Sequence, residues 1–351
     1  MSKPDTAFLK RLLMAPGPSS FETAATKVWL EQAGSYNLAT SQDAYGNGFA
    51  AANTGGNPRV FLAGHIDEIG LIVTYVDSDG FIYVRGVGGW DSQQLLGQRV
   101  RILGYRGEVT GVIGKKAIHL MKPEDRKKVS KIEDVWIDIG ATSGDEAKER
   151  VRVGDAAVLE QPYLELPNNR VVSKALDNRI GAYIVLEAAR RLQGAEAEVT
   201  AAATVQEEIG HAGAAIGAFG KSPDVAIAVD VTHATDIPGL EKKRHGDVTL
   251  GSGAAITVGS VIHRGVFSAL IETAEAEGIP YTIETSPIRT STDGDDLMKV
   301  RAGVPTGLIS VPNRYMHSPN EMVDLDDVEQ VIRLIVAYVK TLNASSVFLQ
   351  P

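Results

Sequence analysis

The sequence predicts an α/β fold, in which helices flank a mostly parallel central sheet and a small β-rich domain is inserted. Three observations lead to this prediction. Apolar runs typical of buried strands lead into His65, Glu207 and Asp230. Segments with the helical spacing of apolar residues alternate with these runs, as in a parallel sheet. Between residues 71 and 166 the pattern changes to closely spaced alternating strands with turn residues.

The N-terminal region is predicted to form two helices and a strand. Thr6–Met14 has apolar side chains at helical spacing, and a turn rich in Pro and Gly at residues 15–20 ends this helix. Residues 21–33 form the second predicted helix, which Gly34 terminates. Residues 59–70 begin with an apolar strand whose end carries His65, Asp67 and Glu68.

The β-rich region divides the chain into two predicted domains. Residues 1–70 and 167–351 form the α/β domain, and residues 71–166 form the insert, with a hairpin turn at residues 77–80. Residues 122–134 are dense in charge and are predicted to be a solvated loop of unassigned function. We expect the exposed strands of the insert to present open edges, which favours oligomerisation through this domain.

The second part of the α/β domain again alternates helices and strands. Its predicted elements are a helix at 180–192, a strand at 199–205, a helix from 212, a strand at 224–230, a helix at 264–277, a strand at 280–284, a strand from 307 and a helix at 324–342. Open α/β sheets bind ligands beyond the carboxyl ends of their strands. The polar residues at those ends are therefore the candidates for function.

The composition excludes several classes of protein. Thirty-five basic and 44 acidic residues give a net charge of -9, which disfavours binding to nucleic acid or to an anionic membrane. The chain has no cysteine, which excludes disulfides, thiolate nucleophiles and cysteine-based zinc sites. No apolar run reaches the ~20 residues that a membrane-spanning helix needs. We therefore expect a cytoplasmic protein in which histidines and carboxylates hold any metal.

The candidate residues begin with the acidic doublet Glu207-Glu208, which follows the strand at 199–205. Neighbouring residues at a strand end point in different directions, so one carboxylate can bind a metal while the other moves a proton. A solvated surface pair is the alternative. His65 and Asp67 follow another strand at a spacing of two, which lets the aspartate orient the imidazole. Here the alternative is a hydrogen-bonded histidine in a turn.

Further acids and one histidine complete the set. Asp177 precedes the helix at 180–192, where it is either a ligand or an N-cap. Asp230 ends a third apolar strand, and His317 follows the strand from 307. Imidazoles and carboxylates without thiolates suit zinc first, and also cobalt or manganese. Two-metal sites with ions ~3.5–4 Å apart polarise a carbonyl and activate a water.

These residues lie in motifs that resemble those of the glutamyl and deblocking aminopeptidases, which include the tetrahedral, dodecameric aminopeptidases of microbes. The resemblance runs nearly from end to end. The motifs are Ala-Pro-Gly-Pro-Ser-Ser-Phe-Glu at 15–22, Gly-His-Ile-Asp-Glu-Ile-Gly at 64–70, Ala-Leu-Asp-Asn-Arg at 175–179, Gln-Glu-Glu-Ile-Gly at 206–210, Val-Asp-Val-Thr-His-Ala at 229–234 and Arg-Tyr-Met-His-Ser-Pro at 314–319.

The resemblance implies a metallo-exopeptidase fold and two divalent metal ions in each chain. Asp177 would bridge the two ions, with Glu208 and His317 completing one site and His65 and Asp230 the other. Asp67 would orient His65, and Glu207 would be the general base. His211 and His233 lie next to the motifs but have no implied role.

The implied reaction is the removal of N-terminal residues from peptides with a free amino terminus by a water that two metals activate. The implied assembly is a homo-oligomer, in which the insert joins dimers that build a dodecamer. The sequence departs from the family pattern at Ser20, at 211–212 and at 291–294, which leaves the preferred N-terminal residue open. An N-acyl-amino-acid deacylase or carboxypeptidase with the same metals is the alternative, with Arg289 or Arg314 binding the substrate carboxylate. A binding protein without catalysis is a third possibility.

Overall fold

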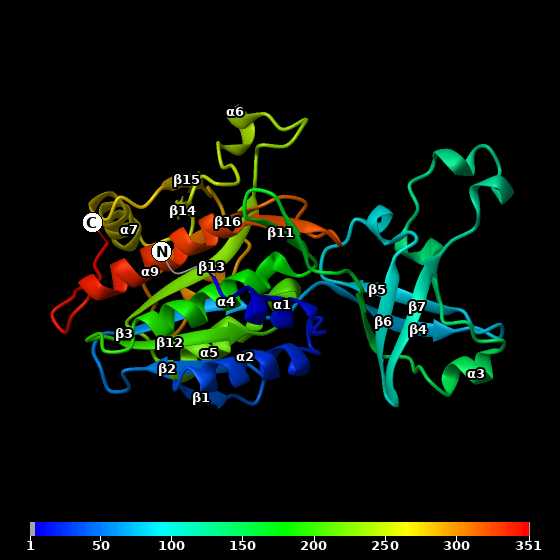
Figure 1. Ribbon diagram of the computed structural model, residues 1–351, viewed down its shortest axis with the longest axis horizontal. Helices are drawn as coiled ribbons and strands as arrows, with labels where there is room; N and C mark the ends of the chain where they lie inside the picture. The colour runs from blue at the N-terminus through cyan, green and yellow to red at the C-terminus, as the bar shows by residue number, and fades with distance from the viewer. Residues whose placement is uncertain (1–3, 351) are drawn as a thin grey trace.

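The computed structural model describes residues 4–350, which form an α/β body and a small barrel beside it (Figure 1). The strands of the body are β1 (Ala39–Gln42), β2 (Gly48–Ala52), β3 (Arg59–His65), β12 (Glu198–Thr204), β13 (Val225–His233), β14 (Ala254–Val258), β15 (Tyr281–Thr285) and β16 (Thr306–Asn313). They form one sheet in the order β1-β2-β12-β3-β13-β16-β14-β15. The central pairs β12–β3, β3–β13 and β13–β16 are parallel, which confirms the predicted fold class.

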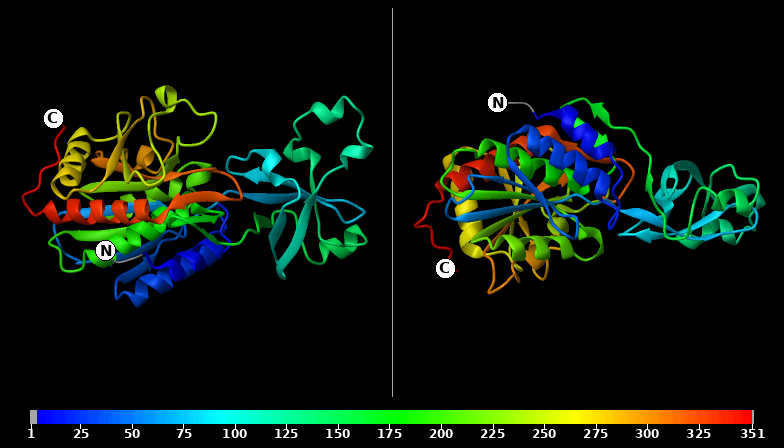
Figure 2. Two further views of the ribbon diagram at one scale, coloured as in Figure 1. Left: turned by 45° about the horizontal axis from the view of Figure 1, so that its top comes forward. Right: turned by 90° about the horizontal axis from the view of Figure 1, so that it is seen from below.

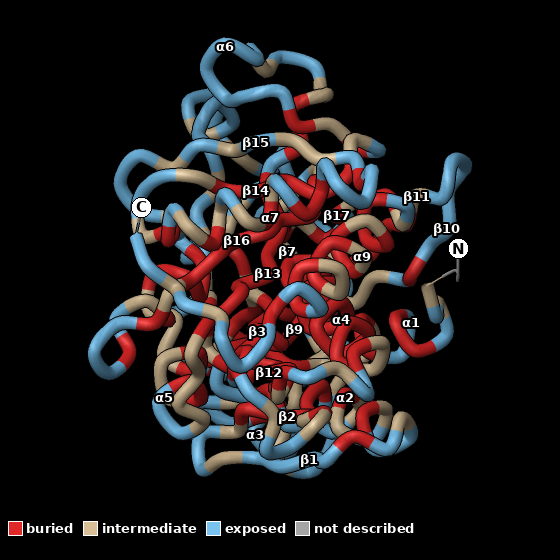
Figure 3. The backbone as a smooth tube through the Cα atoms, turned by 90° about the vertical axis from the view of Figure 1, so that its left-hand side faces the viewer, coloured by how far each residue is buried: buried red, intermediate tan, exposed pale blue. Residues whose placement is uncertain are grey.

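Helices cover both faces of this sheet. They are α1 (Thr6–Met14), α2 (Thr23–Ser35), α4 (Leu176–Arg191), α5 (Ala212–Lys221), α7 (Arg264–Ala276), α8 (Gly294–Leu297) and α9 (Leu325–Thr341). Helices α1, α2, α4 and α9 share one apolar core with the sheet, while α5 and α8 pack on a second core across it. Figure 3 shows the buried chain concentrated along the central strands and α4. The predicted helices are therefore present.

The second helix begins two residues later than predicted. Glu22 is the N-cap residue of α2, and its carboxylate accepts hydrogen bonds from the N–H groups of Ser20 (2.7 Å) and Gln206 (3.2 Å). This carboxylate ties the N-terminal turn to the segment that follows β12. The chain at residues 15–22 thus belongs to the surroundings of the site rather than to α2.

The insert forms a closed barrel from β4 (Gly70–Val76), β5 (Ile82–Val87), β6 (Arg99–Gly104), β7 (Gly107–Gly114), β8 (Trp136–Asp138) and β9 (Ala156–Leu159). The predicted hairpin at residues 77–80 joins β4 and β5. The expectation of open strand edges was wrong, because β9 pairs with both β4 and β6 and so closes the barrel. The barrel encloses its own apolar core. Both views in Figure 2 show the barrel projecting from one side of the body.

Three further strands join the barrel region to the body. β10 (Leu164–Leu166), β11 (Arg170–Ser173) and β17 (Glu321–Asp324) form a separate antiparallel sheet in the order β10-β11-β17. The charged segment 122–134 contains the short turns η3 (Asp125–Lys127) and η4 (Ile132–Asp134), and α3 (Gly144–Lys148) follows it. Another short helix, α6 (Lys242–His245), lies on a loop after β13. Within residues 4–350, no helix is both long and apolar enough to cross a membrane.

Candidate metal centre

The first part of the site is His65, the last residue of β3. Its imidazole is buried, with Nδ1 3.4 Å from Asp67 Oδ1 and Nε2 3.2 Å from Asp177 Oδ1. The side chain of Asp67 also accepts hydrogen bonds from Ser19 Oγ (2.7 Å) and from the N–H of Glu207 (3.1 Å). A carboxylate at Nδ1 favours the tautomer in which Nε2 is free to bind a metal.

The acidic doublet lies just beyond β12, in the 3₁₀ turn η5 (Glu207–Ile209), and both of its side chains are buried. Asp67 accepts hydrogen bonds from the N–H groups of Glu207 (3.1 Å) and Glu208 (3.2 Å). The two carboxylates then point to different partners, because Glu207 Oε2 lies 3.6 Å from His65 Nε2 and Glu208 Oε2 lies 3.5 Å from His317 Nε2. The doublet is therefore no solvated surface pair.

Asp177 lies between the two imidazoles. Its Oδ1 is 3.2 Å from His65 Nε2 and its Oδ2 is 3.3 Å from His317 Nε2. It is not the N-cap of the regular part of α4, because the backbone at Asp177 and Asn178 is not helical and Asn178 Oδ1 accepts the hydrogen bond from the N–H of Gly181 (3.0 Å). The N–H of Asp177 instead donates to Glu321 Oε2 at 2.8 Å. The side chain of Asp177 is thus free to face both histidines.

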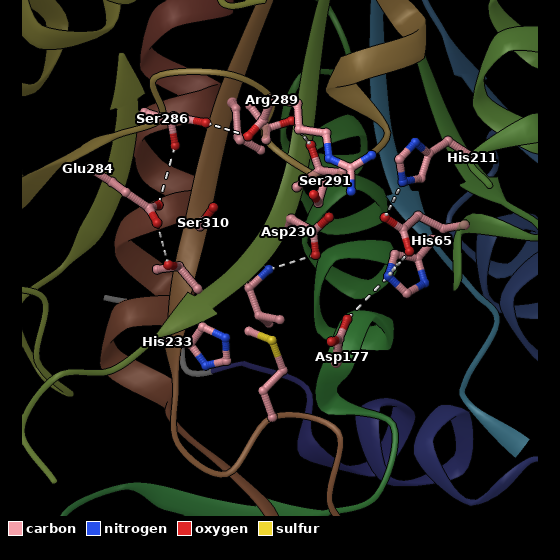
Figure 4. Close-up of a pocket in the computed structure, with 18 of the residues that line it drawn as sticks. His65, Asp177, His211, Asp230, His233, Glu284, Ser286, Arg289, Ser291 and Ser310 are labelled. Carbon is pink, nitrogen blue, oxygen red and sulfur yellow. Dashed lines mark hydrogen bonds and ion pairs between the residues drawn. The ribbon is translucent and has the colours of Figure 1, made fainter. Parts of the chain in front are cut away.

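Two groups of three possible ligands result, and both contain Asp177. The first is His65, Asp177 and Asp230, and the second is Asp177, Glu208 and His317, with the candidate atoms of each group within 4.8 Å of one another. Figure 4 shows Asp177 and Asp230 together on one side of the His65 ring. Asp230 was expected at a strand end but lies inside β13, which continues for three residues to His233. The structure brings together every ligand candidate named from the sequence.

The charges of this cluster are unbalanced when no metal is present. Burial raises the pKa of Glu207 to about 9 and that of Asp230 well above its usual range. Hydrogen bonds to Asp177 and Glu208 raise the pKa of His317 to about 11. The pKa of Asp177 is lowered, because hydrogen bonds from His317 and His65 outweigh the effect of burial. The cluster therefore retains protons where a divalent cation would allow the acids to ionise.

The donor set fits divalent metal ions. Glu208 Oε1 is buried and has no hydrogen-bond partner within the described residues. A buried carboxylate oxygen without a partner costs free energy unless it binds a cation. The ligand atoms are imidazole nitrogens and carboxylate oxygens, which zinc, cobalt and manganese all accept.

Several residues without a role in the sequence analysis support the site. Glu321 accepts hydrogen bonds from the N–H groups of Asp177 (2.8 Å) and His317 (3.0 Å), so it holds the backbone of two ligand candidates in place. Its only signal in the sequence is an acid four residues after His317. His211 was left without a role, yet its Nε2 lies 3.3 Å from Glu207 Oε1.

A cavity of about 570 Å³ opens beside the cluster. Residues of β13, β14 and β16 and the segments 284–287 and 289–292 line it, so Arg289 is among its residues. Arg314, the other expected partner for a substrate carboxylate, is instead paired with Asp236. Gly89 of the barrel lies beside His317, where an added Cβ would be 3.3 Å from Nδ1. The barrel thus contributes to the border of the site.

Comparisons with known proteins agree with this geometry. The profile of the M42 glutamyl aminopeptidases matches residues 46–334. The lysyl aminopeptidase of Pyrococcus furiosus is 34% identical over 349 residues, which cover 97% of this chain and 98% of that protein. The TET aminopeptidase of Thaumarchaeota archaeon SCGC AB-539-E09 is 36% identical, with a TM-score of 0.91 over 96% of both chains.

A further solved relative is the TET1 peptidase of Pyrococcus horikoshii, described as able to assemble into a tetrahedron or a large octahedral shell. It is 32% identical, with a TM-score of 0.85 over 96% of this chain and 99% of that chain. The profile match spans most of the chain, and the relatives extend over nearly all of it. This chain belongs to the M42 glutamyl aminopeptidase family.

Proposed function

We propose that this protein is an aminopeptidase that removes N-terminal residues from peptides with the help of two divalent metal ions. The observation that carries the proposal is the pair of ligand groups that share Asp177. His65 and Asp230 would hold one ion, Glu208 and His317 the other, and Asp177 would bridge them. Zinc suits this donor set, and cobalt or manganese are alternatives. Bound ions would polarise the scissile carbonyl and make the attacking water more acidic.

The chain's own residues supply the proton transfer and the positioning. Glu207 is not a member of either ligand group, and its carboxylate lies between His65 (3.6 Å) and His211 (3.3 Å) at the cavity. It is placed to take a proton from the attacking water and to return it to the leaving amine. Asp67 would fix both the His65 ring and the backbone of the acidic doublet.

The test is a panel of substrates assayed on chelated protein after zinc, cobalt or manganese is restored. We expect hydrolysis of aminoacyl anilides with a free α-amino group, and none of the same anilides after N-acetylation. N-acetyl amino acids and peptides with only a free carboxyl terminus should not be cleaved. Cleavage of those compounds in preference to the anilides would favour the deacylase or carboxypeptidase, for which Arg289 remains a carboxylate partner at the cavity.

We further propose that the protein is a homo-oligomer in which the insert, residues 71–166, joins the subunits. The closed barrel removes the argument from open edges, but Ile118 and Leu120 before the charged segment and Val129 within it expose large apolar side chains. Solved relatives form dodecamers and larger shells. Light scattering that gives the mass of one chain, 37.4 kDa, would contradict this proposal. The cytoplasmic location stays a prediction.

A further inference from the structure

Glu284 is an acid in the cavity that the proposed metal chemistry does not use. It lies on β15, one residue before the end of that strand, and its side chain is half-buried. Its carboxylate accepts hydrogen bonds from Thr232 Oγ1 (2.7 Å) and Thr257 Oγ1 (3.4 Å). The two threonines come from different strands, β13 and β14, and both are buried. The carboxylate therefore has a defined position.

This position is close to the ligand Asp230 and on the same face of the sheet. Thr232 follows Asp230 by two residues in β13, so both side chains project from one face about 7 Å apart. Glu284 Oε1 lies 2.7 Å from Thr232 Oγ1. Figure 4 shows Glu284 across the cavity from Asp177 and His65, with Ser310 between Glu284 and Asp230. A side chain that starts at the metal centre can thus extend toward Glu284.

The surroundings of Glu284 favour a cation. Among residues 4–350 its carboxylate forms hydrogen bonds with hydroxyl groups but no ion pair with a Lys, Arg or His side chain. A carboxylate held in a cavity binds an ammonium or guanidinium group with charge-assisted hydrogen bonds. Leu308 and Met316 also line this cavity, and they offer apolar contact to an aliphatic stem. Lysine has such a stem of four carbons and a compact charged end.

Arg289 lies at the cavity but does not form an ion pair with Glu284. Arg289 is exposed, and Figure 4 shows its guanidinium pointing away from Glu284 and toward Ser291. Its backbone oxygen accepts a hydrogen bond from Ser286 Oγ (2.6 Å), which fixes the loop but not the side chain. An acidic substrate side chain could pair with the exposed Arg289, but the fixed carboxylate of Glu284 would repel it.

We propose that Glu284 binds the charged side chain of the first substrate residue, so that the enzyme prefers peptides that begin with lysine or arginine. This inference rests on the proposed aminopeptidase function and names its substrate class. Glu284 would determine specificity without taking part in the reaction at the peptide bond.

The experiment compares kcat/KM for lysyl and norleucyl anilides, since norleucine has an aliphatic side chain of similar length without the charge. We expect wild-type protein to favour the lysyl substrate, and Glu284→Gln to lower the lysyl-to-norleucyl ratio by about 10- to 100-fold. Glutamine keeps the shape; its amide oxygen can accept from one threonine hydroxyl and its amide NH2 can donate to the other. Glu284→Lys should shift the preference toward glutamyl anilide. Equal metal content of wild type and variants establishes that the site is intact.

The control variant is Glu275→Gln. Glu275 lies on α7 outside the cavity and accepts a hydrogen bond from the Tyr281 hydroxyl (3.2 Å), so the substitution removes one nearby acid without altering the cavity. It should leave the ratio at the wild-type value. A wild-type preference for norleucyl or glutamyl anilide, or an unchanged ratio in Glu284→Gln, would overturn the inference. Absence of cleavage of every free-amino anilide would instead reject the proposed function.

Discussion

Two buried clusters of charged side chains lie next to each other in this protein, and they differ in whether the chain supplies enough cations for the carboxylates. In the first, Glu68 receives Lys174 Nζ (2.6 Å) and Arg179 Nη2 (2.9 Å), and all three side chains are buried. In the second, the side chains of Asp177, Glu207, Glu208 and Asp230 face the imidazoles of His65, His211 and His317, with no Lys or Arg side chain paired to them among residues 4–350. Neighbouring residues, Asp67 and Glu68, contact the two clusters.

The difference shows which cluster needs a cation from outside the chain. The Glu68 cluster provides its own cations, and Arg179 also donates to the backbone oxygens of Ile66, Leu12 and Leu13. It joins the N-terminal segment to the sheet and has a structural role. The acidic cluster has more carboxylates than cations, and burial together with the neighbouring carboxylates raises the pKa of Glu207 and Asp230. Such clusters of shifted groups are typical of functional sites.

The largest expected effect separates the catalyst from the ligand within the doublet. Glu207→Gln keeps the shape of the side chain but removes the proton acceptor, so we expect kcat to fall by ~10²–10⁴. Both metal ions should remain bound. The matched control Glu208→Gln should lose metal from one site first. Elemental analysis and kinetics of the two variants test this assignment. The roles would have to be exchanged if Glu207→Gln lost metal while Glu208→Gln kept both ions and was inactive.

A substitution in the Glu68 cluster should change the stability of the protein rather than its catalysis. Glu68→Gln leaves Lys174 and Arg179 buried without their anion, which costs about 3–5 kcal/mol of unfolding free energy. Asp230→Asn in metal-free protein should instead be neutral or stabilising, because it removes an acid that burial disfavours. Denaturant unfolding of both metal-free variants measures this contrast. Similar losses of unfolding free energy in the two variants would mean that the carboxylates of the acidic cluster are as well compensated by cationic groups as Glu68 is.

The elements of the body were predictable because buried strands and amphipathic helices leave local patterns. The helix Thr6–Met14 has the predicted bounds, the last helix differs by one residue at each end, and the strand predicted from residue 59 ends at His65. Barrel closure was not predictable, since it depends on the pairing of β9 with both β4 and β6. No local pattern in Ala156–Leu159 specifies two partners.

The ligand candidates were predictable from acids and histidines near the ends of buried strands, together with the family motifs. The supporting residues were not. Glu321 acts through the backbone N–H groups of Asp177 and His317, and such contacts leave no spacing rule in the sequence. Glu284 was assigned only to a strand, because its approach to Thr232 depends on how strands far apart in the chain are arranged.

A smaller effect should appear in the pH dependence of the metal-free protein. Burial raises the pKa of Glu207 from 4.5 to about 9, and hydrogen bonds to Asp177 and Glu208 raise that of His317 from 6.5 to about 11. Both groups bind more protons when folded, so unfolding free energy should fall as the pH rises from about 7 to about 9. The lowered pKa of Asp177 acts only at acidic pH. Each group should contribute up to about 1.4 kcal/mol of this loss per pH unit.

Metal-loaded protein should show much less of this dependence, because bound cations favour the deprotonated forms of the ligands. Thermal unfolding of both forms in matched buffers across this range measures the difference. Parallel curves for the two forms would mean that the protons and the metals do not compete for the same groups.

The most direct test of the account is the metal content of wild-type protein, Asp177→Asn and Glu187→Gln. Glu187 is a second buried acid of α4, and it pairs with Arg190 and Tyr36 away from the site, so its variant controls for loss of an acid from this helix. The account predicts two divalent ions per chain in wild type and Glu187→Gln, and the loss of both from Asp177→Asn. Two ions retained by Asp177→Asn, or none in fully active wild type, would contradict it.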